Sequence, residues 1–118
     1  MSALSFKKQF APDVESGKKR QTIRAIRADF RTIKPGEKLY LYTGMRTKGC
    51  RKLKDTVCAS VRHFRMITST VWTINGDLAT DAEQVQIAKD DGFKCVGDMV
   101  DFFREVHGLP FEGHIINW

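Results

Sequence analysis

Cysteine is scarce in this sequence, and its spacing excludes two common ways of stabilising a small domain. Three cysteines, an odd number, do not make a disulfide framework. The spacing Cys50-x7-Cys58-x4-His63, with Cys95 alone, also lacks the paired ligands of a zinc site. We therefore expect reduced thiols, no bound metal and no other cofactor.

Long apolar runs, prolines and linkers are lacking as well. No run approaches the roughly 20 apolar residues that span a bilayer, and residues 1–10 hold no apolar stretch of signal-peptide length. The three prolines are scattered, and no repeat or low-complexity tract divides the 118 residues. This length is close to the mode for one domain. We therefore expect a single cytoplasmic domain, residues 1–118, with no membrane association.

Positive charge is present in excess, and it is unevenly distributed. The chain has 20 Lys and Arg against 14 Asp and Glu, a net charge of +6. Residues 1–70 carry 17 of the basic residues and 5 acidic ones, a balance of +12, whereas residues 71–118 carry 3 basic and 9 acidic ones, a balance of −6. A basic half of this kind favours a nucleic-acid partner.

The first half of the chain predicts strands separated by turns and one short helix. Phe10 and Val14 share a helical face, and Gly17 is placed to end that helix. Leu39 and Leu41 alternate with Tyr40 and Tyr42, which favours a strand covered on both faces. The expected elements are strands at 4–6, 20–24, 38–43 and 57–66, a turn at 34–37, a basic loop at 44–54, and a β-bulge or barrel corner near Arg62 and His63.

The second half predicts two helices followed by a closing strand. Thr80 and Glu83 have the spacing of a capping box, so a helix is expected from about Asp81 to Asp90. A second apolar stripe at helical spacing ends at Gly108. The expected elements are a strand at 71–74, a turn at 75–77, helices at 81–90 and from 96 to Gly108, and a strand at 111–118. Strands on both sides of a helical pair indicate an α+β domain.

The densest basic segment runs from Gly17 to Arg24 and lies in an expected strand. Alternate side chains of a strand point the same way, so Arg20, Thr22 and Arg24 would share one face. The exit from a turn at Gly17 could still bring Lys19 beside Thr22. Charge runs are more often solvated surface, but a second basic block favours RNA binding. The expected RNA contacts are Lys18, Arg20, Arg24, Arg27, Arg46, Lys48, Arg51 and Lys52, with Tyr40 and Tyr42 as rings on which bases stack.

Asp90 and Asp91 are adjacent acids at the expected end of a helix. Negative charge at a helix C-terminus is unfavourable because the helix dipole is negative there. Local misfits of this kind occur at functional sites. We therefore expect a basic group to lie opposite this pair.

Four motifs follow one another in an order that is typical of a known family. They are Gly17-x-Lys19-x-x-Thr22-Ile23-Arg24, Pro35-Gly36-Glu37, Ala88-x-x-Asp91-Gly92-Phe93 and Phe111-x-Gly113-x-Ile115-Ile116-x-Trp118. Together they resemble the ASCH domains, which are relatives of the PUA RNA-binding fold. The resemblance spans nearly the whole chain. It implies a small curled or closed β-barrel with helices packed around a basic cleft.

The resemblance also implies a choice of functions and a set of site residues. The family includes RNA-binding modules, a ribonuclease, and small amidohydrolases that remove the acetyl group of N4-acetylcytidine. In the amidohydrolases a Lys, a Thr and a Glu act together, and by position these match Lys19, Thr22 and Asp91. Here Asp replaces the family's Glu, which shortens the carboxylate by one methylene.

Three functions therefore stay open at this point. The first is an RNA- or modified-nucleoside-binding domain, and the second is a hydrolase, either an N4-acetylcytidine amidohydrolase or a metal-independent ribonuclease. In the hydrolase, a desolvated Lys19 takes a proton from Thr22 or water, and Arg24 or a backbone N–H stabilises the oxyanion. The third is a module for an acidic protein partner. A Lys19–Asp91 separation beyond direct or one-water contact would favour binding, because proton transfer needs roughly 3 Å.

Overall fold

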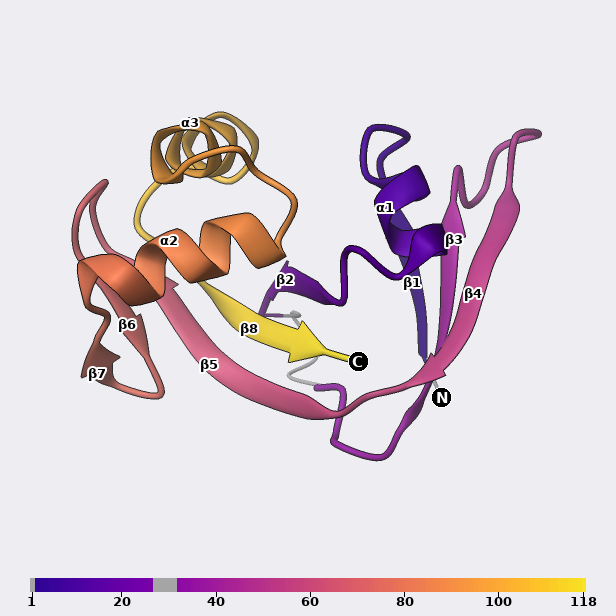
Figure 1. The fold of residues 1–118 in the computed structure, drawn as a ribbon, viewed down its shortest axis with the longest axis horizontal. Coiled ribbons are helices and arrows are strands. Elements are labelled where there is room, and N and C mark those ends of the chain that lie inside the picture. Colours follow the sequence, from indigo (N-terminus) through magenta and orange to yellow (C-terminus); the bar gives the residue numbers. More distant parts are fainter. Residues whose placement is uncertain (1, 27–31) are drawn as a thin grey trace.

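The computed structural model describes residues 2–26 and 32–118, and within these ranges the chain has eight strands and three helices (Figure 1). In chain order they are β1 (Ser2–Phe6), α1 (Ala11–Ser16), β2 (Gln21–Ala25), β3 (Lys38–Thr43), β4 (Arg51–Val57), β5 (Ser60–Met66), β6 (Trp72–Ile74), β7 (Asp77–Leu78), α2 (Asp81–Asp90), α3 (Val96–Val106) and β8 (Phe111–Asn117). The α+β class expected from the sequence is confirmed. None of these helices combines the length and the apolar character needed to cross a bilayer.

The strands form two sheets. One has the order β1-β3-β4, with β1 parallel to β3, and the other has the antiparallel order β2-β8-β5-β6-β7. β4 passes into β5 through Cys58 and Ala59, and Figure 1 shows the two strands following one curve from the first sheet to the second. Of the two expected alternatives, a curled or a closed barrel, the closed barrel is not found among the described residues.

The buried side chains form two hydrophobic cores that meet at two phenylalanines, one mainly on the three-stranded sheet but including Ile116 of β8, and one on the five-stranded sheet. α1 packs on the three-stranded sheet, where Val14 and Leu39 are fully buried. α2 and α3 cover the five-stranded sheet over the buried ring of Phe64 (Figure 1). Phe93 and Phe102 pack against both cores. The boundary between the cores is therefore lined with aromatic rings.

The helix and turn signals of the sequence are confirmed at their expected positions. Gly17 ends α1 with a φ of 86°, a left-handed value that favours glycine. Thr80 and Glu83 form the capping box at the start of α2. These signals succeeded because each depends on residues only a few positions apart.

Two expectations for the middle of the chain are wrong. Residues 51–54, expected in a loop, belong to β4, which pairs with β3, and β5 starts only at Ser60. β5 then pairs with β8 without interruption, so no bulge lies at His63. The shift of register falls in the β3–β4 pair instead, where Leu53 of β4 is the extra residue opposite Leu41 and Tyr42. The alternation of side chains did not reveal that the chain changes sheets at Cys58.

β3 was expected to be covered on both faces, but only one of its faces is fully buried. Leu39 and Leu41 are fully buried, whereas Tyr40 and Tyr42 on the opposite face are only half-buried. The group that lies over the tyrosines is the ammonium of Lys52 from β4, with Nζ 5.0 and 5.8 Å from the two ring centroids. A single flexible side chain leaves this face accessible to solvent.

Candidate active site

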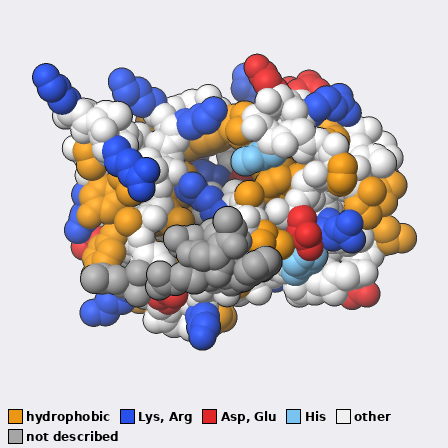
Figure 2. Space-filling view, turned by 180° about the vertical axis from the view of Figure 1, so that it is seen from behind, with side chains coloured by type: hydrophobic (Ala, Val, Ile, Leu, Met, Phe, Trp, Pro, Cys, Tyr) orange, Lys and Arg blue, Asp and Glu red, His pale blue; other side chains and the backbone are white. Residues whose placement is uncertain are grey.

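A pocket of about 230 Å³ lies where the two cores meet. Its walls come from the end of β1, the turn that follows, β2, the end of α2, and α3. Figure 2 shows the molecule hollowed near the middle of one face, with Lys and Arg side chains gathered beside the hollow. Segments from the basic half and the acidic half of the chain therefore line one pocket.

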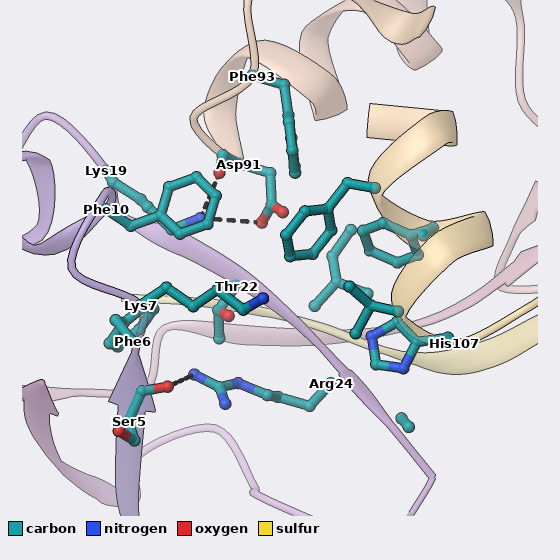
Figure 3. Close-up of a pocket in the computed structure, with 15 residues that line it drawn as sticks. Ser5, Phe6, Lys7, Phe10, Lys19, Thr22, Arg24, Asp91, Phe93 and His107 are labelled. Atoms are coloured by element: carbon teal, nitrogen blue, oxygen red, sulfur yellow. Dashed lines mark hydrogen bonds and ion pairs between the residues drawn. The ribbon is translucent and has the colours of Figure 1, made fainter. Parts of the chain in front are cut away.

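A buried ion pair forms part of the pocket wall. Lys19 Nζ lies 3.1 Å from Asp91 Oδ1 and donates a second hydrogen bond, 2.6 Å long, to the backbone oxygen of Asp91 (Figure 3). Both side chains are buried. The expected basic group opposite the acidic pair is thus Lys19, and it contacts Asp91 directly.

The end of α2 explains how Asp91 is presented to Lys19. The chain turns at Gly92, whose φ is 95°, and the backbone N–H groups of Asp91, Gly92 and Phe93 donate to the last turn of α2. Lys19 donates to the oxygen of Asp91, the residue after α2, and the Gln21 side-chain amide gives the oxygen of Ile87 a second hydrogen bond, 3.2 Å long, beside that from the Asp91 N–H. A cation at a helix C-terminus also interacts favourably with the helix dipole. The segment entering β2 therefore caps α2.

Burial shifts the pKa values of the two ion-pair members toward each other. Desolvation lowers the pKa of Lys19, although Asp91 opposes the shift, and the nearby positive charge of Arg24 lowers it further. Desolvation also raises the pKa of Asp91, against the effect of Lys19. Both shifts favour the uncharged forms. A general base must be unprotonated. The neutral amine of Lys19 therefore forms more readily in this pocket than it would in water.

Thr22 and Arg24 lie on one face of β2, as expected, and both line the pocket. In Figure 3 the Thr22 side chain lies between the ion pair and the guanidinium of Arg24. Arg24 Nη2 donates to the backbone oxygen of Ser5 at 2.7 Å, and the guanidinium lies 5.0 Å from the ring centroid of Phe6. The structure thus brings the expected Lys19, Thr22 and Asp91 together, with Arg24 at the opposite end.

Three phenylalanines form an apolar wall of the pocket. The ring centroids of Phe10, Phe93 and Phe102 lie 5.3 to 6.2 Å from one another, and Lys19 Nζ lies 5.1 Å from that of Phe10. Rings in such an arrangement offer a surface for a planar base. Apart from Phe93 in the third motif, no sequence signal pointed to the further lining residues, which include Lys7, Phe10, Phe102 and His107.

The other expected RNA contacts do not line this pocket. Lys18 and Arg20 are exposed beside β2. Arg27 lies outside the described residues. The second basic block, Arg46, Lys48, Arg51 and Lys52, is exposed on β4 and the loop before it, near the half-buried Tyr40 and Tyr42. Of the expected RNA contacts that the structure describes, only Arg24 therefore lines the pocket.

Neither the thiols nor the histidines gather into a metal site in the part of the chain that the structure describes. Cys50 and Cys95 are exposed, Cys58 is buried, and all three are free thiols. Comparison of the chain with protein-family models, curated proteins and solved structures found no match. The resemblance to ASCH domains therefore rests on the motifs of the sequence.

Proposed function

We propose that this chain is an ASCH-type domain of PUA-like fold, and that its pocket hydrolyses the acyl amide of a modified nucleoside of the N4-acetylcytidine type. The observation that carries the proposal is the direct contact of Lys19 with Asp91 in a pocket that Thr22 also lines. Positioned proton transfer needs a separation of roughly 3 Å. The aromatic wall adds a surface for the base.

The chemistry begins with attack on the carbonyl carbon of the acetyl group. The nucleophile is the hydroxyl of Thr22 or a water molecule, and the neutral amine of Lys19 accepts its proton. The bond between that carbon and N4 then breaks, and the leaving nitrogen takes a proton from the Lys19 ammonium. If Thr22 is the nucleophile, a water molecule hydrolyses the acyl-threonine ester. Either route yields acetate and cytidine.

The aspartate at position 91 is compatible with this role although it is shorter than the family's glutamate. Its carboxylate reaches Lys19 at 3.1 Å, and its own backbone oxygen holds the same ammonium at 2.6 Å. The lysine is therefore positioned by two acceptors from one residue. Arg24 is held by Ser5 on the far side of Thr22 (Figure 3), so a backbone N–H is the better candidate for the oxyanion.

The test is an incubation of the purified protein with N4-acetylcytidine, with cytidine and acetate measured by chromatography. Thr22→Val removes the hydroxyl with little change of shape, and Thr73→Val on β6 is the matched control outside the pocket. With Thr22 as nucleophile we expect a loss of at least about 100-fold in Thr22→Val and none in Thr73→Val. Full activity in Thr22→Val would assign the attack to water. No product from the wild-type protein would refute the proposal.

RNA binding is the second candidate function, and the outer face of β3 and β4 supports it. Tyr40 and Tyr42 are half-buried with Lys52 above their rings, and exposed cations lie in the adjoining loop. Stackable rings beside cations suit single-stranded RNA. Labelled RNA in the same incubations measures both retention and cleavage. Retention that Tyr42→Ala abolishes would support this face, and cleavage that requires Lys19 would assign a ribonuclease.

A further inference from the structure

Arg24 carries a positive charge at the end of the pocket opposite the ion pair. None of the ion pairs in the described part of the chain involves it. Its Nη2 donates to the oxygen of Ser5, but its Nε is buried without a partner. A buried donor without an acceptor is unfavourable, and a ligand that supplies the acceptor removes that cost. This end of the pocket is therefore suited to an anion.

Lys7 and His107 lie at the same pocket as Arg24. Lys7 Nζ is 4.8 Å from the ring centroid of Phe102, and Figure 3 shows the Lys7 side chain extending across the pocket above Thr22. The pKa of His107 is lowered by burial and then by the charges of Lys7 and Arg24, so the three groups are near enough to interact.

The charges of the described residues that line the pocket do not balance without a ligand. Among the described residues that line it, Asp91 is the only acid, and its carboxylate contacts Lys19. Lys7 and Arg24 thus remain as two positive charges with no carboxylate of the described residues at contact distance. An uncharged nucleoside would leave both uncompensated, whereas a phosphate monoester would accept hydrogen bonds from both and from the unpaired Nε.

We propose that Lys7, Arg24 and His107 form an anion subsite, and that the pocket therefore takes a nucleoside monophosphate in preference to a free nucleoside. The inference rests on the proposed function, because it places the base at the aromatic wall. Thr22 and Arg24 lie two residues apart on one face of a strand, a distance of roughly 7 Å along it. The reacting end of a nucleotide and its phosphate therefore have separate positions.

A single nucleotide fits these observations better than a continuous RNA strand. The pocket is about 230 Å³ and is walled by rings, whereas the exposed cations suited to a strand lie elsewhere, on β4 and its loop. The exposed Lys7 can also attract an anion from solution before it enters. RNA is thus the alternative that the experiment has to exclude.

The experiment is a calorimetric titration at low salt, with cytidine, cytidine monophosphates (5′ and 3′) and inorganic phosphate as separate ligands. Lys7→Met removes one charge of the subsite, and Lys8→Met is the matched control, because Lys8 is the adjacent exposed lysine and does not line the pocket. We expect a monophosphate to bind more tightly than either cytidine or phosphate alone. Lys7→Met should weaken monophosphate binding about fivefold, as for one partly exposed ion pair, and cytidine binding less. Lys8→Met should change neither.

Equal affinities for cytidine and both monophosphates, or equal losses in the two lysine variants, would overturn the subsite. Phosphate alone binding as tightly as a monophosphate would overturn the nucleotide preference, and so would binding of single-stranded RNA without binding of either monophosphate. The titration requires no turnover. If the protein does not deacetylate N4-acetylcytidine, the hydrolase proposal is refuted, and the result of the titration still stands. If the protein is active but binds monophosphates no more tightly than cytidine, only the anion subsite is refuted.

Discussion

Two lysines of this protein lie at the same distance from an aspartate, yet their surroundings are opposite. Lys19 Nζ is 3.1 Å from Asp91 in the pocket, and Lys52 Nζ is 3.1 Å from Asp55 on the outer face of β4. The exposed fractions of the side chains are 3% and 9% in the first pair but 45% and 59% in the second. Contact distance alone therefore does not distinguish a candidate catalytic lysine from a surface one.

The pKa values show which difference matters. Burial lowers the pKa of Lys19 despite its carboxylate partner, whereas the hydrogen bond with Asp55 raises the pKa of Lys52. Each ammonium also lies about equally close to an aromatic ring, at 5.1 Å from Phe10 and 5.0 Å from Tyr40. Since partner and ring are alike, the exclusion of water is what separates the two sites.

The largest expected contrast is in activity. Lys19→Met removes the proposed general base, so we expect deacetylation of N4-acetylcytidine to fall by about 10² to 10⁴-fold. Lys52→Met, outside the pocket, should retain the wild-type rate. Steady-state kcat/KM measured for both variants gives the comparison. Equal rates in the two variants would mean that Lys19 has no part in the chemistry.

The second contrast is in stability. Asp91→Asn leaves the buried Lys19 without its carboxylate, and breaking a buried pair in this way costs about 3 to 5 kcal/mol. Asp55→Asn breaks an exposed pair, so its effect on unfolding should be too small to measure. Denaturant unfolding of both variants tests this. A loss in Asp55→Asn as large as in Asp91→Asn would contradict the assignment of burial as the decisive factor.

The third contrast is in the pH dependence of stability. Because the folded-state pKa of Lys19 is below its ordinary value of 10.5, the unfolded chain binds more protons between the two values. The free energy of unfolding should therefore rise with pH in that window, by at most about 1.4 kcal/mol per pH unit. Lys19→Met should lack this rise, and Lys52→Met should retain it. Unfolding curves from neutral pH to 10.5 that are parallel in all three proteins would refute the shift.

The smallest contrast concerns RNA. If the outer face of β3 and β4 binds phosphates, Lys52→Met should reduce the slope of log affinity against log salt by about 1. Lys19→Met should leave the slope unchanged, because Lys19 is buried and already paired. Filter binding over a salt series measures it. If only Lys19→Met changed the slope of log affinity against log salt, the RNA would bind at the pocket and not at the outer face of β3 and β4.

Much of the local structure was predictable from the sequence because its signals are short-range. The capping box of Thr80 and Glu83 and the turn at Gly17 each act over a few residues, and α2 begins and ends where expected. The strand boundaries around Cys58 were not predictable in the same way. The strands that pair with β4 and β5 decide where β4 ends and β5 begins. The pattern of apolar residues does not indicate which strands those partners are.

For the site, the sequence by itself determined the basic and acidic halves and, through motifs that resemble those of ASCH domains, the choice of Lys19, Thr22 and Asp91 as candidates. Only the tertiary structure decided that Lys19 and Asp91, which are 72 positions apart, are in contact and buried from solvent. It also placed Lys7 and His107 with Arg24 in the same pocket. Contact and burial depend on how the two cores pack against each other, and no stretch of neighbouring residues encodes that packing.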